Sequence, residues 1–268
     1  RFGGLVAFFV GALWLGSKAA DRAYSLEPTA FIASRVTPDG SFYKIIRFIG
    51  GGGSFGSLLV SLFKDYSRRL ENLSKIFYGI AVLGMVSLFL VDDARSALLL
   101  PIFTLPVLVS FVVGELTLRG KHTLLIYRKA PSGVRRFVKA RLLHGCLIVV
   151  PIVGAFTFIS TIARVTPQLT FYSILTYAGL AMLSAAATVT FVLGLFLLNP
   201  AFSDKSASYI INLNITIFGL SNGFFLVPVM LLGYNHLLST ISFVSIPLTW
   251  VAAIILLYVG HGKLSRME

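Results

Sequence analysis

Positive charge is concentrated in one internal segment of the chain, Gly114–Gly145. This segment holds eight Lys or Arg residues and a single acid, Glu115, and apolar stretches flank it on both sides. Guanidinium and ammonium groups bind phosphate and carboxylate groups, so the chemistry that the segment offers is recognition of an anionic surface. The segment therefore faces either the headgroup layer of anionic lipids or a cytoplasmic partner protein.

The other residues that support chemistry are too scattered to form a catalytic or metal site. Asp92 and Asp93 are adjacent, and we expect them to lie in a solvated turn. No Walker A motif is present, so the chain is not expected to hydrolyse ATP. Four histidines have no metal-binding neighbour at helical spacing: His122, His144, His236 and His261. We therefore predict no catalytic residue, no metal and no cofactor, and a protein that is not itself an enzyme.

The elements that position the basic segment are transmembrane helices. Of the 268 residues, 56% are hydrophobic and only 12% are charged, and the mean hydropathy is +0.87. A soluble domain carries roughly a quarter charged residues. The formal charge of +13 would suggest nucleic acid for a soluble protein, but on a membrane protein it favours anionic lipid and topology, so we expect no nucleic acid.

Eight stretches approach the roughly 20 apolar residues that a helix needs to cross a bilayer. The weakest is Phe42–Phe63, because Lys44 and Arg47 lie near its start and Gly50–Gly53 favours a break in the helix or a loop at the membrane edge. The first candidate along the chain, Phe2–Ser17, is short, and we expect further residues upstream of Arg1. The other seven candidates are Phe2–Ser17, Ile76–Val91, Ala97–Gly114, Cys146–Ala163, Phe171–Leu198, Ser208–Gly233 and Ile241–Gly260.

The distribution of Lys and Arg among the loops predicts the orientation. Eight spans place 16 basic residues on one side and seven on the other. Basic loops stay in the cytoplasm. We therefore expect a plasma (inner) membrane protein with both termini cytoplasmic. If Phe42–Phe63 does not cross, the segment before it is re-threaded and the six later spans keep their direction.

Within the basic segment, the sequence predicts a helix-turn-helix at the cytoplasmic membrane surface. Leu118–Lys129 forms a short helix, Pro131 ends it, and the apolar residues of Val134–Leu143 share one face of a second, amphipathic helix that leads into the span at Cys146. Two interpretations stay open: a docking element for a cytoplasmic partner, or a loop that binds lipid and fixes topology. The predicted lipid-binding residues are Arg135, Arg136, Lys139 and Arg141.

Two helical faces within the spans carry small or polar residues. In Phe171–Leu198, small residues recur at helical spacing and predict a seam where another helix approaches closely. Its members are Ala178, Ala181, Ala185 and Thr188. In Ser208–Gly233, polar residues either hold helices together or line a substrate path. The candidate path residues are Asn212, Thr216, Ser221 and Asn222.

The basic segment resembles the cytoplasmic loop of type-2 ABC-exporter permeases. In that family a span ends in a Glu, a Gly-Thr-Leu element begins a coupling helix, and a Pro-Ser turn leads to a basic helix. The matching elements here are Glu115, Gly120 with Thr123 and Leu124, Ala130–Ser132, and Arg136–Leu143. The stretch Leu62–Lys75 is similar to the family's amphipathic connecting helix, and six spans between Ile76 and Gly260 are similar to its core.

The resemblance implies a permease subunit that works as a homodimer or hetero-oligomer with a separate cytoplasmic ATPase. It implies two parts: residues 1–75, with N-terminal spans and the connecting helix, and residues 76–268, a six-span core with the coupling loop 115–145. A non-catalytic accessory subunit that binds lipid and partner subunits is the alternative. The implied partner-binding residues are Glu115, Arg119, Gly120, Thr123, Leu124, Leu125, Arg128 and Lys129.

Overall fold

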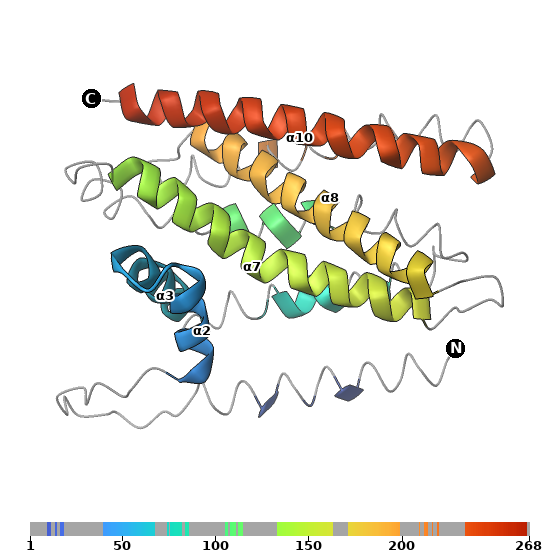
Figure 1. The fold of residues 1–268 in the computed structure, drawn as a ribbon, viewed down its shortest axis with the longest axis horizontal. Coiled ribbons are helices and arrows are strands. Elements are labelled where there is room, and N and C mark those ends of the chain that lie inside the picture. The colour runs from blue at the N-terminus through green and yellow to red at the C-terminus, as the bar shows by residue number, and fades with distance from the viewer. Residues whose placement is uncertain are drawn as a thin grey trace. The chain divides into compact units, whose positions relative to one another are not determined.

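The fold is known from a computed structural model, drawn as a ribbon in Figure 1. It describes the backbone alone at 234–244 and 265–266. The described residues are 10–11, 14, 17–18, 40–67, 74, 76–81, 84–85, 105–106, 108–110, 112–114, 133–162, 171–198, 209, 212–213, 216, 219 and 234–266.

Within these residues, all regular secondary structure is α-helical, which confirms the predicted all-α class for this part of the chain. The chain divides into two compact units, Arg1–Tyr78 and Gly79–Glu268. The division predicted from the sequence, at residue 75, lies close to this boundary. Among the described residues, the first unit contains α2 (Ser41–Ile49) and α3 (Ser54–Ser67), and the second contains α7 (Gly133–Ile162), α8 (Phe171–Leu198) and α10 (Tyr234–Arg266).

In the first unit, α2 and α3 form a helical hairpin around a glycine turn. Gly51 and Gly52 have positive φ angles of 77° and 70°, a conformation that glycine adopts without steric cost. Gly50 and Gly56 let the two helices touch, because a Cβ on Gly50 would lie 2.6 Å from the Gly56 Cα and a Cβ on Gly56 would lie 2.6 Å from the Arg47 carbonyl oxygen.

This hairpin confirms the break expected at Gly50–Gly53 and corrects the candidate span over Phe42–Phe63. The segment is two helices of 9 and 14 residues. At 1.5 Å per residue they are about 13 and 21 Å long, and each is shorter than the roughly 30 Å hydrocarbon core. Lys44 and Arg47 lie in the shorter one. Neither helix therefore crosses a bilayer alone.

Three helices of the second unit are long and apolar enough to cross a membrane. They are α7, α8 and the part of α10 from Ser245 to Leu264. These lengths and compositions indicate a helical membrane protein. The bounds of α8 match the predicted span, whereas α7 and α10 extend well beyond their predicted spans. In the other predicted spans, the described residues are helical.

Helix α8 is the centre of this unit and packs along both α7 and α10 (Figure 1). The four members of the predicted small-residue seam are buried, as that prediction requires. Glycines bring the helices together: a Cβ on Gly194 of α8 would lie 2.8 Å from the backbone nitrogen of Leu257, and one on Gly260 of α10 would lie 2.8 Å from the Leu197 Cβ. Helices associate in lipid through such close backbone approach. Acyl chains are as apolar as the helix surfaces, so no hydrophobic force drives the helices together.

The same glycine contacts give the helix directions. On α7, Gly145 faces Val189 and Gly154 faces Met182 of α8, so α7 and α8 are antiparallel. On α10, Leu257 and Gly260 face Gly194 and Leu197, so α8 and α10 are parallel. The beginning of α7 and the ends of α8 and α10 therefore lie at one end of the unit, as Figure 1 shows.

Candidate functional site

The three long helices carry all their Lys and Arg residues at one end, which we call the basic end. Helix α8 contains no charged residue, and neither do α7 after Leu142 and α10 before Lys263. Because the start of α7 and the end of α10 lie together, these charges gather at one end of the unit. The basic end comprises Arg135, Arg136, Lys139 and Arg141 of α7 and Lys263 and Arg266 of α10.

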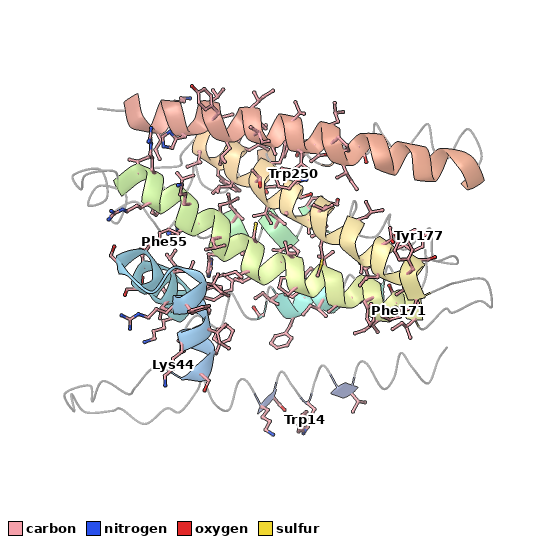
Figure 2. The ribbon with its side chains drawn as sticks, in the orientation of Figure 1. Trp14, Lys44, Phe55, Phe171, Tyr177 and Trp250 are labelled. Carbon is pink, nitrogen blue, oxygen red and sulfur yellow. The ribbon has the colours of Figure 1, made fainter. Side chains whose placement is uncertain are left out.

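The opposite end carries aromatic side chains. At the start of α8, Phe171 and Tyr172 are exposed, and Tyr177 lies just beyond them (Figure 2). Tyr is enriched where helices leave the hydrocarbon layer, because its ring is apolar and its hydroxyl is polar. Charge at one end and these aromatic residues at the start of α8 are consistent with helices that span a membrane.

The first three turns of α7 separate exposed cations from a buried apolar face. Arg135, Arg136 and Lys139 are exposed, whereas Phe137 and Val138 are buried. This agrees with the amphipathic pattern predicted for Val134–Leu143. The predicted second helix and the predicted span are, however, one uninterrupted helix from Gly133 to Ile162.

The electrostatics at the start of α7 favour an anion. The first turn contains no acidic residue, while Arg135 and Arg136 occupy its third and fourth positions. A helix N-terminus carries about half a positive charge, so each cation there is unfavourable by about 0.3–1 kcal/mol. A phosphate or carboxylate at this place would offset that repulsion and would meet both the side chains and the helix dipole.

Arg141 differs from the other three predicted lipid-binding residues, because it turns into the protein. Its side chain is only 7% exposed, and its guanidinium carbon lies 4.9 Å from the centre of the Phe137 ring. One turn further along, His144 is fully buried. The cation therefore rests on an aromatic face within the unit, a contact that stabilises a buried guanidinium.

The remaining predicted site residues are placed only in part. All eight predicted partner-binding residues, from Glu115 to Lys129, lie outside the described residues, as do Ser221 and Asn222. Asn212 and Thr216 are helical and exposed, and the Thr216 hydroxyl donates a 2.8 Å hydrogen bond to the Asn212 carbonyl oxygen. These two residues share one helical face, as the path prediction requires.

Sequence reasoning missed the inward position of Arg141 and His144. The available signal was spacing, because Arg141 follows Phe137 by four residues and precedes Gly145 by four, and both neighbours are buried. It also missed the exposed apolar face of α2, where Phe42, Ile45 and Phe48 recur every third residue.

Comparison with known proteins gives no relative: no family model, curated protein or solved structure matches this chain.

Proposed function

We propose that the chain is the transmembrane permease subunit of an ABC-type exporter, coupled through the basic loop 115–145 to a separate cytoplasmic ATPase that docks on residues 115–129 of this loop. The observation that carries the proposal is the uninterrupted course of α7, which starts within that loop and continues to Ile162 against α8. A continuous helix of this kind passes a displacement at its first turn into the membrane-spanning part, where Pro151 removes one backbone hydrogen bond of the helix. The family resemblance of the loop, carried by Glu115, by Gly120 with Thr123 and Leu124, and by Ala130–Ser132, also supports the proposal.

The orientation follows from the basic end. Lys and Arg are retained on the cytoplasmic side of membranes, so the proposal places the start of α7 and the C-terminal part of α10 in the cytoplasm of a plasma (inner) membrane protein. The parallel course of α8 and α10 supports a returning span between them, as predicted for Ser208–Gly233. The side of the N-terminal end depends on whether Phe2–Ser17 and Phe42–Phe63 both cross, so the basic end orients only the second unit.

The assembly proposed is a homodimer or hetero-oligomer of permeases with paired ATPase subunits. Arg135, Arg136 and Lys139 are exposed at the basic end and suit anionic headgroups. Within the membrane, Asn212 and Thr216 are the described candidates for a substrate path. The accessory-subunit alternative shares the lipid contacts but lacks the ATPase.

The proposal is tested by purifying the tagged full-length chain from its native membranes and identifying the bound proteins by mass spectrometry. We expect an ATP-binding subunit with a Walker A motif. Replacing Leu124 and Leu125 with Asp removes two apolar anchors from the predicted docking helix. If they act as an interface hot spot of about 2 kcal/mol or more, recovery of the ATPase falls about thirtyfold at limiting concentration.

A matched control separates docking from lipid binding. The variant Arg135→Gln/Lys139→Gln removes two exposed charges of α7 and should lower retention of anionic lipid while the ATPase still co-purifies. Recovery of subunits of a larger assembly with no ATPase among them would contradict the exporter proposal and favour the accessory role. Unchanged recovery of the ATPase with the Leu124→Asp/Leu125→Asp variant would contradict docking at this helix.

A further inference from the structure

Helix α2 presents a continuous apolar face that is largely exposed. Phe48 is 83% exposed, and Phe42 and Ile45 are each about 60% exposed; Ile49 completes the face. With 3.6 residues per turn, positions 42, 45, 48 and 49 fall within about one third of the helix circumference. The inner side chain of α2 is Ile46, which is buried.

Basic side chains accompany this face. Lys44 and Arg47 are exposed on α2, and α2 contains no acidic residue. Within 40–67, Asp65 is the single acid, against Lys44, Arg47 and Lys64. A short helix with aromatic and aliphatic residues on one face and cations beside it is typical of helices that lie in the headgroup layer of an anionic membrane.

The hairpin is closed at its open end by three contacts. The Tyr43 hydroxyl and the Ser67 hydroxyl are 3.3 Å apart. The Lys64 ammonium lies 5.3 Å from the centre of the Tyr43 ring, and the Phe42 and Phe63 rings meet edge to face at 6.0 Å. The beginning of α2 and the end of α3 are therefore held together.

We propose that the α2–α3 hairpin does not cross the membrane, and that α2 lies in the interfacial layer of one leaflet. The apolar face of Phe42, Ile45, Phe48 and Ile49 enters the acyl region, and Lys44 and Arg47 bind the phosphates of anionic lipids. Because the open end of the hairpin is closed, the chain enters and leaves on the same side of the bilayer.

A lipid bilayer fits this face better than a partner protein does. The partner must offer an apolar layer bordered by anions over the length of α2, which is the layering of an anionic bilayer surface. A bilayer is also close at hand, since the same chain carries three helices that are long and apolar enough to cross one. The inference holds for an exporter and for an accessory subunit alike.

Depth-dependent fluorescence quenching tests the insertion. In the full-length protein with Trp14→Phe and Trp250→Phe, a single indole is placed by Phe48→Trp, or by Ile254→Trp as a ruler, because Ile254 is exposed near the middle of α10's apolar part. In vesicles of brominated phosphatidylglycerol, the indole at position 48 should be quenched most by bromines near the acyl carbonyls, and the indole at position 254 by deeper bromines. Absence of quenching at position 48 means a covering protein or water, and overturns the proposal.

The charge contribution is measured with the same Phe48→Trp variant. Each Lys or Arg near an anionic membrane contributes about 1 kcal/mol, so Lys44→Gln/Arg47→Gln should lower the local preference for brominated phosphatidylglycerol over brominated phosphatidylcholine by up to about thirtyfold. Charges at the basic end are unchanged by these substitutions. An equal preference before and after them would contradict phosphate binding by Lys44 and Arg47.

Cysteine labelling tests the path of the chain. In the Cys146→Ser background, Ser41→Cys and Ser67→Cys each place one thiol at an exposed position at the open end of the hairpin. A membrane-impermeant maleimide should label both from the same side of sealed vesicles. Labelling from opposite sides would mean that the segment crosses, and the proposal would be lost.

Discussion

The α2–α3 hairpin and the α7–α8–α10 bundle both depend on glycine, but they use it for different purposes. In the hairpin, Gly51 and Gly52 supply the left-handed backbone of a turn. In the bundle, Gly194 and Gly260 have ordinary helical backbone and supply space, because the neighbouring helix occupies the place of a side chain. In the hairpin, glycine allows a backbone conformation that reverses the chain. In the bundle, glycine lacks a side chain and therefore lets two helices pack closely.

The two regions also distribute charge differently. In the hairpin, Lys44 and Arg47 alternate with exposed apolar residues along a single short helix. In the bundle, α8 has no charge at all, and the cations of α7 and α10 lie at one end. Charged residues that alternate with apolar ones suit a helix parallel to a membrane surface. Charged residues confined to one end suit helices that cross the membrane.

The largest expected effect is at the contact between α8 and α10. Replacing Gly194 with Leu forces a side chain into the backbone of Leu256 and Leu257, and we expect a loss of about 3 kcal/mol or more in unfolding free energy. The measurement is unfolding by denaturing detergent in mixed micelles. Gly179→Leu is the control, because a Cβ on Gly179 meets nothing within 4 Å. An equal loss of unfolding free energy in both variants would mean that the close packing at Gly194 does not cause the destabilisation.

A smaller effect is expected at the buried cation. Arg141→Ala removes the stem that packs in the protein and the cation that rests on Phe137, so unfolding free energy should fall by about 2 kcal/mol. Arg135→Ala alters an exposed residue of the same helix and should change it by less than about 0.5 kcal/mol. The same unfolding assay compares them, and similar values for both would show that Arg141 is not a packed residue.

The smallest effect belongs to the hairpin turn. Gly51→Ala places a Cβ in a left-handed conformation and should destabilise the turn by about 1 kcal/mol. Gly53→Ala, at a glycine without positive φ and with open space around it, should be neutral or slightly stabilising. Hydrogen exchange of the α2 amides reports this locally, and Gly51→Ala should speed it about fivefold. Equal exchange in both variants would show that the turn does not depend on φ.

The bundle could be predicted from sequence where one property decides the structure. Helix α8 was predicted with its observed bounds because it is an uncharged apolar stretch flanked by polar residues. Its buried seam follows from the spacing of Ala178, Ala181 and Ala185. Hydropathy alone placed the start of α7 too late, because a helix continues through the amphipathic turns from Gly133 onward, and it shortened α10 for the same reason.

The fold-back of the hairpin could not be predicted in the same way. Four glycines indicate a break, but they do not say whether the next helix continues onward or returns. That choice depends on contacts between residues distant in sequence, such as Tyr43 with Ser67, and on the Arg47 carbonyl touching Gly56. Likewise, spacing places Arg141 on the same face of α7 as Phe137 and Gly145, but only packing shows that this face is buried while Arg135, Arg136 and Lys139 are exposed.

The backbone contact between Gly194 and the turn of α10 at Leu257 limits how these helices can move. Rotation of either helix about its own axis would bring the side chain of Leu197 or Leu256 into the contact at Gly194. That contact has no room even for a Cβ atom. We therefore expect helices α8 and α10 to tilt or shift together, whereas α7 meets α8 through side chains such as Met182 and Val189.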